Sequence, residues 1–391
     1  MYSNRKILLA EDTIDAQELH QLASWLQSGT RLTKGPLTLD FERAFAQYIG
    51  TKHAIFVNSG SSANLLIAYA LLKSGHLRNN VVIAPTVAWV TTIAPFMQFG
   101  FEVKLCDCNA TDLGFDLDAF EAMCEQYQPA CAILVHVLGH ATDMDRLLSI
   151  CKRHDVHLIE DTCEALGSEY KGQKLGSLGL AGSFSFYYGH HISTIEGGMV
   201  VLNDSYLFNV MLSIRSHGWA RDLQDASMHA AWTKEYGIDE VRDLYTFYFP
   251  GFNLRSTDLN AFLGLSQLKK LESLVHKRES NFLLYRQLLP KFWSQQSPTS
   301  TLSSFAYGLL VQNRLETCKY LTSHGIESRP LICGSLARHP FWTKEKDSVD
   351  LPMASIVHDH GIYLPNHGNL STEDIHFIAD KVNEVAKPLF F

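Results

Sequence analysis

The sequence predicts an α/β fold, with a large domain built on one mostly parallel sheet of about seven strands and a smaller C-terminal α/β domain. Two features of the chain lead to this prediction. Short apolar runs with little polar alternation recur through residues 53–202, as in strands that are buried on both faces. Segments with helical apolar spacing separate these runs, which is typical of parallel strands joined by covering helices.

The elements of the large domain follow one another in regular order. A buried-strand run at 53–59 leads directly into a helical pattern at 61–75. Later strands alternate with further helical patterns, and a helix over 206–218 leaves the sheet. These strands are expected at 81–86, 102–108, 130–139, 156–162, 182–187 and 197–202.

The second half of the chain is less regular. Residues 220–245 are polar and poorly periodic, which predicts a loop or an excursion. A long helical pattern then connects to a strand at 303–311, a helix at 314–324 and a last helix from Thr372 to Ala386. We therefore expect a large domain over residues 1–250, including an N-terminal arm, and a smaller domain over 251–391.

Composition and charge limit the classes of function. The chain has 391 residues, of which 46% are apolar, and its net charge of −8 argues against binding to nucleic acid or a membrane surface. No apolar stretch approaches the ~18 residues of a membrane span, and the first apolar run is too short for a signal peptide. The eight cysteines are scattered, without a second close pair at metal-site spacing. We expect a soluble cytoplasmic protein with no metal.

The stretch SFSFYYGHHISTIEGGM, residues 183–199, is predicted as strand, short loop and strand. His190 lies in the loop, five residues after Ser185, and no lysine occurs between Lys174 and Lys234. An imidazole moves protons near neutral pH, but it does not form a stable covalent bond with an aldehyde as a lysine amine does. The stretch therefore indicates proton chemistry at His190.

The turn NSGSSANLL joins the first strand to its helix. Gly60 allows close approach of another backbone, and Ser61 and Ser62 place hydroxyl and amide groups at the helix N-terminus. A helix N-terminus favours an anion such as phosphate, although serines there also serve as simple helix caps. Both interpretations are open from this motif alone.

Two further residues follow strands at the expected ligand-binding edge of the sheet. Asp161 ends the strand at 156–162, where a buried acid needs a cationic partner to stay ionised, unless it caps a helix. Trp89 opens the helix after the strand at 81–86, where its indole could stack on a flat ring or pack in the core. Together with the serines, these residues favour a phosphorylated, protonated aromatic ligand.

These motifs resemble those of the DegT/DnrJ/EryC1 family of pyridoxal-phosphate (PLP) sugar aminotransferases, and the likeness extends from about residue 30 to about residue 370. In that family a lysine five residues after the serine binds the cofactor. Here His190 occupies that position, as in the family's sugar 3-dehydratase branch. The resemblance implies an aspartate-aminotransferase-like (fold type I) homodimer with active sites shared between subunits.

The resemblance also assigns roles to residues. His190 rather than its neighbour His191 matches the lysine position, Ser185 is expected to contact the phosphate, and Asp161 the ring nitrogen. Glu164 marks the dehydratase branch, since aminotransferases usually have glutamine there. The resemblance further implies that Asn253 binds the cofactor phosphate of the other subunit. It also implies contacts to substrates by Thr30, Arg31, Leu32, Thr33, His217, Arg221 and Arg255.

The implied activity is removal of the C3 hydroxyl of a nucleotide-linked 4-keto-6-deoxyhexose, with GDP-4-keto-6-deoxymannose as the first candidate. L-glutamate would convert PLP to pyridoxamine 5'-phosphate (PMP), and 2-oxoglutarate and ammonia would be released. Alternatives are a nucleotide-sugar aminotransferase, a dehydratase for a CDP- or dTDP-sugar, and a non-catalytic relative. An iron–sulfur cluster with a reductase partner is not expected, because no cysteine occurs between Cys163 and Cys318.

Overall fold

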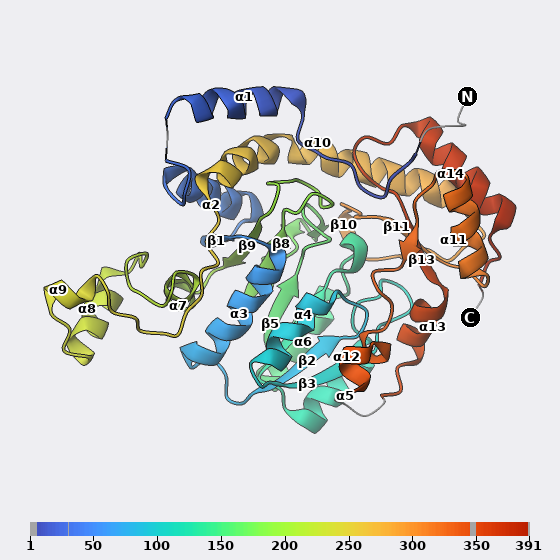
Figure 1. Cartoon of the computed structure of the whole chain (residues 1–391). Helices are drawn as coiled ribbons and strands as arrows, with labels where there is room; N and C mark the ends of the chain where they lie inside the picture. The colour runs from blue at the N-terminus through green and yellow to red at the C-terminus, as the bar shows by residue number, and fades with distance from the viewer. Residues whose placement is uncertain (1–5, 30, 345–348, 390–391) are drawn as a thin grey trace.

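The computed structural model describes residues 6–29, 31–344 and 349–389 (Figure 1). Its main element is a seven-stranded sheet in the order β1-β9-β8-β5-β4-β2-β3. Strand β9 runs antiparallel to its neighbours β1 and β8, and the other pairs are parallel. The predicted mostly parallel sheet is confirmed. Its strands are β1 (His53–Val57), β2 (Val81–Pro85), β3 (Glu102–Cys106), β4 (Cys131–Val135), β5 (His157–Asp161), β8 (Ala181–Ser185) and β9 (Gly198–Leu202).

Helices cover both faces of the sheet, as the buried strand runs predict (Figure 1). Val82 and Ala84 of β2 pack with α3, α4 and α7, whereas Ile83 between them packs with α5 and α6 on the opposite face. Near the β1 edge, Phe56 packs with α2 and α10. These helices are α2 (Pro36–Ile49), α3 (Gly60–Ser74), α4 (Val90–Gln98), α5 (Leu117–Tyr127), α6 (Met144–His154), α7 (Ser205–Arg215) and α10 (Asp258–Leu288).

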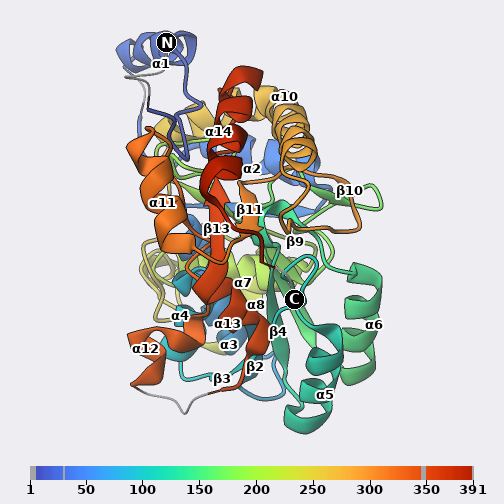
Figure 2. The same cartoon turned by 90° about the vertical axis from the view of Figure 1, so that its right-hand side faces the viewer.

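The C-terminal part has its own antiparallel sheet, β11-β13-β12, flanked by helices (Figure 2). Helix α10 belongs to two apolar cores, because Ala261 and Leu271 pack with the large sheet while Phe282 and Tyr285 pack with the C-terminal elements. A domain boundary at residue 250 stays a prediction. The elements are β11 (Tyr307–Leu310), β12 (Arg329–Pro330), β13 (Gly361–Leu364), α11 (Arg314–Ser323), α13 (Pro352–His360) and α14 (Thr372–Val385).

Two segments extend from the body in Figure 1. Helix α1 (Ala16–Gln27) lies beside α10, where Trp25 stacks on Phe262 with ring centroids 5.2 Å apart. Residues 220–245 leave the body as an excursion, but they contain two helices, α8 (Ala226–Glu235) and α9 (Glu240–Asp243), that the polar pattern did not predict. Each begins at an aspartate N-cap, Asp225 or Asp239, which accepts two backbone N–H groups.

Smaller elements complete the chain. They are β6 (Glu169–Tyr170), β7 (Gln173–Lys174), β10 (Thr299–Thr301), α12 (Pro340–Thr343) and the 3₁₀ turns at Val137–Gly139 and Leu336–Arg338. In the part of the chain that the structure describes, no helix has both the length and the apolar content needed to cross a bilayer.

Candidate active site

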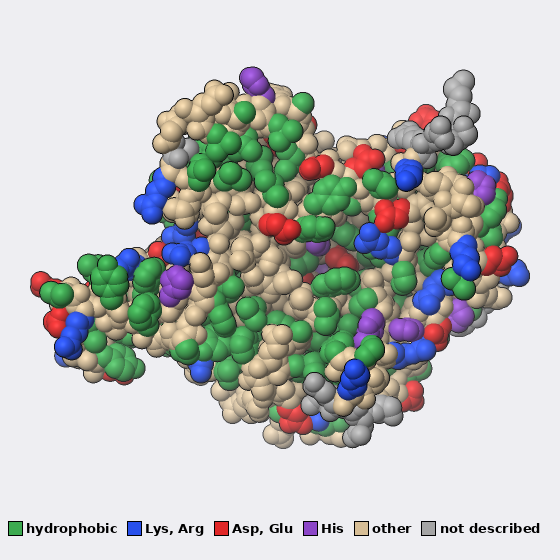
Figure 3. Space-filling view, in the orientation of Figure 1, with side chains coloured by type: hydrophobic (Ala, Val, Ile, Leu, Met, Phe, Trp, Pro, Cys, Tyr) green, Lys and Arg blue, Asp and Glu red, His purple; other side chains and the backbone are tan. Residues whose placement is uncertain are grey.

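A cavity of about 480 Å³ opens where β4, β5 and β8 reach their carboxyl ends, the edge at which open α/β sheets bind ligands. In the space-filling view it is a hollow near the centre of the face (Figure 3). We call it the central cavity. Residues from the N-terminal segment and the C-terminal part complete its walls. The predicted site residues that line it are Gly60, Ser61, Trp89, Asp161, Glu164, Ser185 and His190.

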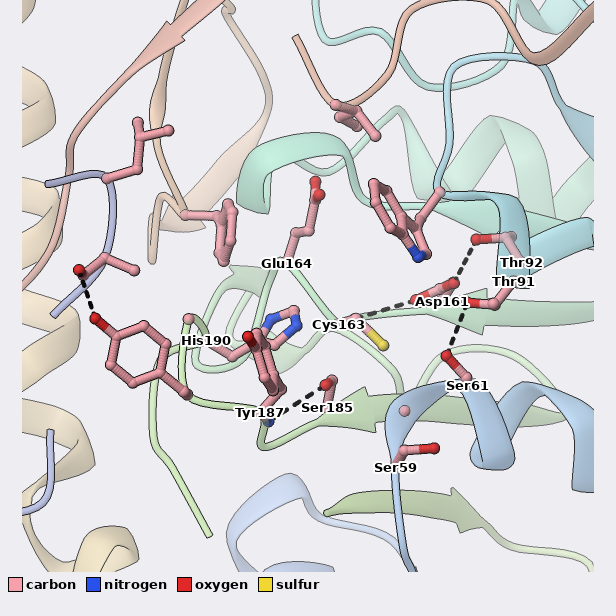
Figure 4. Close-up of a pocket in the computed structure, with 18 of the residues that line it drawn as sticks. Ser59, Ser61, Thr91, Thr92, Asp161, Cys163, Glu164, Ser185, Tyr187 and His190 are labelled. Atoms are coloured by element: carbon pink, nitrogen blue, oxygen red, sulfur yellow. Dashed lines mark hydrogen bonds between the residues drawn. The ribbon is translucent and has the colours of Figure 1, made fainter. Parts of the chain in front are cut away.

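His190 lies on the wall formed by the loop after β8 (Figure 4). Its ring packs against Phe305 with centroids 5.3 Å apart, and its Nδ1 has no hydrogen-bond partner among the described residues. Burial lowers the pKa of His190 to about 4, which the carbonyl of Cys163 and the charge of Asp161 partly offset. The imidazole is therefore neutral at pH 7 and able to accept a proton.

The adjacent His191 has different surroundings. It is fully buried, its Nε2 lies 2.9 Å from the carbonyl oxygen of Ser303, and it does not line the central cavity. Burial also holds the pKa of His191 well below its usual value. The structure thus places the first histidine of the pair at the cavity and uses the second to fix the loop to the C-terminal part.

Asp161 ends β5 at the floor of the cavity, with 5% of its surface exposed. Its Oδ2 accepts hydrogen bonds from Asn64 Nδ2 at 2.9 Å and from Thr92 Oγ1 at 2.8 Å. Its Oδ1 accepts the backbone N–H of Cys163 at 3.2 Å. All three contacts present donors to the carboxyl group, so both of its oxygens act as acceptors.

Glu164 lies three residues further along the chain and also faces the cavity (Figure 4). Its Oε2 accepts the backbone N–H of Leu138 at 2.9 Å. Leu138 has a left-handed backbone with φ +52°, a conformation that residues other than glycine rarely adopt. Burial raises the pKa of Glu164 to about 7, the Leu138 N–H opposes this rise, and the charge of Asp161 adds to it. Glu164 is therefore partly protonated near neutral pH.

The serine-rich turn lies beside the end of β8. Ser59, not Ser61 or Ser62, is the N-cap of α3, because its hydroxyl accepts the N–H of Ser62 at 3.0 Å. Ser61 is thereby free of the cap role, and its hydroxyl reaches Thr91 Oγ1 at 3.1 Å on the cavity wall. Ser62 does not line the cavity. A Cβ on Gly60 would lie 2.6 Å from that of Ser185, so glycine is required for this approach.

Trp89 stands at the N-cap position of α4, as its place after the strand predicts. Its side chain is 58% exposed at the cavity wall, which excludes the alternative of core packing. The indole offers a flat apolar face to the cavity.

The predicted residues of the second half of the chain gather elsewhere. Arg255 donates to Asn253 Oδ1 at 3.1 Å and contacts His217 Nε2 at 3.2 Å. Arg221 lies over the ring of Trp219 at 4.3 Å and donates to the carbonyl of Leu244. None of the four predicted residues lines the central cavity of its own chain. We refer to His217, Arg221, Asn253 and Arg255 as the 217–255 cluster.

The segment predicted to touch the sugar precedes α2. Arg31, Leu32 and Thr33 are exposed and do not line the cavity, and Thr30 lies outside the described residues. The carbonyl of Leu32 accepts the N–H of Asp258 at 3.1 Å, which fixes the segment to the start of α10.

A model of the DegT/DnrJ/EryC1/StrS aminotransferase family matches residues 12–383. The chain belongs to this family. A GDP-4-keto-6-deoxy-D-mannose 3-dehydratase from Yersinia pseudotuberculosis is 33% identical over 380 residues, covering 93% of this chain and 95% of that protein. The UDP-4-amino-4,6-dideoxy-N-acetyl-β-L-altrosamine transaminase of Helicobacter pylori is 28% identical over 97% of both chains.

Solved structures of the family agree with the fold. The crystal structure of a GDP-4-keto-6-deoxymannose-3-dehydratase mutant with bound GDP-perosamine has a TM-score of 0.86 and 28% identity to this chain. The match covers 96% of this chain and 99% of that one. The predicted aspartate-aminotransferase-like (fold type I) architecture is confirmed.

For this family member, sequence reasoning missed several residues that line the cavity. Asn64 and Thr92 stand inside motifs that were recognised, so the signal was present, but neither residue type by itself indicates a site. The others come from distant segments that meet only in the fold. They include Leu8, Leu9, Ala10, Phe305, Glu327, Arg329, Ile332 and Tyr363, whereas Tyr187 and Tyr188 lie inside the recognised stretch 183–199.

Arg329 has a particular place among the missed residues. It is the one Arg or Lys among the described residues that line the cavity, whereas several carboxyl groups line it. Its guanidinium lies 2.9 Å from Glu327 Oε1, and Glu327 Oε2 accepts the N–H of Leu9. The pair therefore ties the N-terminal segment to the cavity wall and places a cation at that wall.

Proposed function

We propose that the protein is a PLP/PMP-dependent 3-dehydratase that removes the C3 hydroxyl of a nucleotide-linked 4-keto-6-deoxyhexose. GDP-4-keto-6-deoxymannose is the preferred candidate substrate, with L-glutamate as amino donor. The observation that carries this proposal is a neutral histidine, His190, at the cavity position where a cofactor-binding lysine would stand, while no lysine lines the described cavity. The similarity to named 3-dehydratases over nearly the whole chain supports the same activity.

The residues present fit the cofactor. Asp161 offers an oriented acceptor to a protonated ring nitrogen, and Trp89 offers a flat face for the ring. Ser61 and Ser185 offer hydroxyl groups near the first turn of α3, where a phosphate is favoured. When bound, the cofactor would supply an electron sink and, in its PMP form, an amine for the sugar ketone.

His190 is proposed as the group that moves protons during the reaction. With the cofactor bound, its neutral ring would accept a proton and could return it to the departing C3 oxygen. Glu164, protonated below a pH of about 7, can donate a hydrogen bond to an oxygen of the bound ring. The balance closes because glutamate loses two electrons to become 2-oxoglutarate, and the sugar gains them as its C–O bond breaks.

The 217–255 cluster is proposed to act in a homodimer. In its own chain this cluster lies outside the central cavity, yet it contains Asn253 and two arginines suited to phosphate and carboxylate groups. A partner subunit that brings the cluster to the cavity would complete the site. The proposal requires no iron–sulfur reductase, and we place the enzyme in the cytoplasm, where its eight free cysteines would stay reduced.

A nucleotide-sugar aminotransferase is the second candidate. The transaminase from Helicobacter pylori aligns over as much of the chain as the 3-dehydratases do. A dehydratase for another nucleotide sugar is also considered, since a dTDP-4-dehydro-2,6-dideoxy-D-glucose 3-dehydratase from Saccharopolyspora spinosa is 31% identical. The three differ in the product that they form.

One incubation separates these candidates. The protein is mixed with PLP, L-glutamate and, in parallel, GDP-, CDP- or dTDP-linked 4-keto-6-deoxyhexose, and products are identified by mass spectrometry. A 3-dehydratase yields a 3-deoxy-4-keto sugar one oxygen atom lighter than the substrate, with ammonia and 2-oxoglutarate in equal amounts. An amino sugar without free ammonia would replace the proposal by the aminotransferase.

A further inference from the structure

The carboxylate of Asp161 receives donors from two helices that are separate in sequence. Asn64 in α3 and Thr92 in the first turn of α4 both donate to Oδ2, at 2.9 and 2.8 Å. Both side chains are almost completely buried, with 2% and 1% of their surfaces exposed. Figure 4 shows Thr92 directed at Asp161.

The side-chain amide of Asn64 is oriented toward the carboxylate of Asp161. Its amide directs nitrogen at Asp161 and leaves its own Oδ1 buried without a hydrogen-bond partner among the described residues. Leaving an acceptor unpaired in the interior is unfavourable, so the amide orientation is set by the carboxylate. An ionised carboxylate accepts hydrogen bonds but cannot donate one, which is what this arrangement matches.

We propose that Asn64 and Thr92 are positioning residues that keep Asp161 ionised and aimed, and so hold the proton on the ring nitrogen of the bound cofactor. This inference rests on the proposed function, in which Asp161 faces that nitrogen. Oδ2 accepts both side chains, whereas Oδ1 accepts the backbone N–H of Cys163 and is the oxygen that we assign to the ring. Removal of either donor raises the proton affinity of Asp161, and the shared proton then moves from the ring to the acid.

Other titratable groups surround Asp161 and set the background for this effect. The thiol of Cys163, the carboxyl of Glu164 and the imidazole of His190 each interact with its charge. Burial of Cys163 and Glu164 raises the pKa of each, and burial of His190 lowers its pKa, so all three favour their neutral forms. The hydrogen-bond donors around Asp161 are thus the side chains of Asn64 and Thr92, the backbone N–H of Cys163 and the thiol of Cys163.

The test compares Thr92→Val, Thr92→Ser and Asn64→Leu with the unaltered protein. Valine keeps the shape of threonine and lacks the donor, whereas serine keeps the donor. Each protein is loaded with PLP labelled with ¹⁵N in the ring, and the nitrogen chemical shift is followed by NMR across pH. The unaltered protein and Thr92→Ser should hold a protonated nitrogen throughout.

Thr92→Val and Asn64→Leu should weaken proton binding at the ring by about 10- to 100-fold, the range expected for losing one hydrogen bond to a charged group. Their signals should shift toward neutral pyridine and titrate at lower pH. Unchanged nitrogen signals in both variants would overturn this inference and leave the proposed function standing. A loss in Thr92→Ser equal to that in Thr92→Val would also overturn it, since packing rather than the donor would be responsible.

The outcome is separate from that of the proposed function. If the unaltered protein does not bind PLP at all, the proposed function fails and this inference fails with it. If PLP binds and the ring nitrogen behaves alike in every protein, the function stands and the role of Asn64 and Thr92 is withdrawn. Thermal unfolding of the apo forms verifies that each variant is folded before it is loaded.

Discussion

His190 and His191 show how far neighbouring side chains can differ in role. The spacing from Ser185 selects the first, and in the structure His190 lines the central cavity whereas His191 does not. Sequence spacing alone could not reveal that His191 bonds the carbonyl of Ser303, more than a hundred residues away. That contact depends on how the C-terminal part closes over the loop.

Replacement of His190 by asparagine should abolish dehydration while the fold stays intact. Asparagine retains size and polarity but cannot accept the proton, and a loss at or beyond ~10⁴-fold in kcat is expected for a residue that serves several transfers. Steady-state release of 2-oxoglutarate and ammonia measures the loss. His191→Asn should instead lower the free energy of unfolding by about 1–3 kcal/mol, since it opens a gap in a buried contact. Equal losses of kcat in the two variants would contradict the assignment.

Glu164 should make the stability of the apo protein depend on pH. Its pKa rises from 4.5 in the unfolded chain to about 7 in the folded one, so the unfolded state releases its proton first as pH increases. The free energy of unfolding therefore falls through this window, by up to about 3 kcal/mol, and the loss is constant above it. Glu164→Gln has no such titration and should be more stable than the unaltered protein at pH 8.

Urea unfolding at pH 5 and pH 8 tests this prediction. The stability difference between Glu164→Gln and the unaltered protein should be small at the lower pH and large at the higher one. A difference of the same size at both values would mean that the carboxyl group ionises in the folded protein as it does in the unfolded chain.

Among the helices and strands, the sequence predicted those whose buried side chains form a clear periodic pattern of apolar residues. The seven strands of the main sheet carry short apolar runs, and each was expected near its observed place, whereas the covering helix α2 was not predicted. Helices α8 and α9 were missed because they lie on the surface, where capping by Asp225 and Asp239 replaces an apolar face. A cap is one residue, and aspartate is common in loops, so this signal is weak before the structure is known.

The junction of α2 and α10 depends on one buried carboxylate. Helix α2 has no side-chain cap of its own, and Asp258 of α10 accepts the N–H groups of Gly35, Leu37 and Thr38, together with the Thr38 hydroxyl. Asp258→Ala should destabilise the protein by about 3 kcal/mol, because it leaves these donors unpaired at the positive end of a helix. Asp258→Asn should cost less.

Chemical denaturation of both variants measures these costs. The neighbouring Asp40 offers a matched control, since it is a half-exposed aspartate in α2 whose described partner is the surface residue Arg43. Asp40→Ala should change the stability by no more than about 0.5 kcal/mol. Similar losses for Asp258→Ala and Asp40→Ala would show that the buried contacts contribute nothing specific.

For the whole molecule, the sequence motifs located one half of the site and left the arrangement of the other half open. The motifs around Gly60, Asp161 and Ser185 converge because parallel strands end at one edge. The N-terminal segment and the residues around Arg329 reach the same cavity through long-range contacts that carry no local pattern. The 217–255 cluster is assembled within one chain and does not line that chain's central cavity, which is why we propose a second copy for its role.

If the active site is shared between two subunits, two inactive variants should restore activity to each other in a mixed dimer. In the proposed dimer, His190→Asn disables the cavity of its own subunit, whereas Arg255→Gln disables the cavity of the partner. Each variant alone should be nearly inactive. A mixed dimer contains one cavity with both defects and one with neither, so co-refolded protein should recover roughly a quarter of the unaltered activity when subunits pair at random.

The activity of the co-refolded mixture is compared with that of the two variants refolded separately and then combined. His190→Asn paired with Asp161→Asn, two defects of the same cavity, serves as the control and should recover nothing, because each mixed dimer then has one defect in each cavity. Full activity of Arg255→Gln alone would remove Arg255 from the reaction. An inactive mixture of confirmed mixed dimers would mean that the 217–255 cluster serves the subunit that carries it.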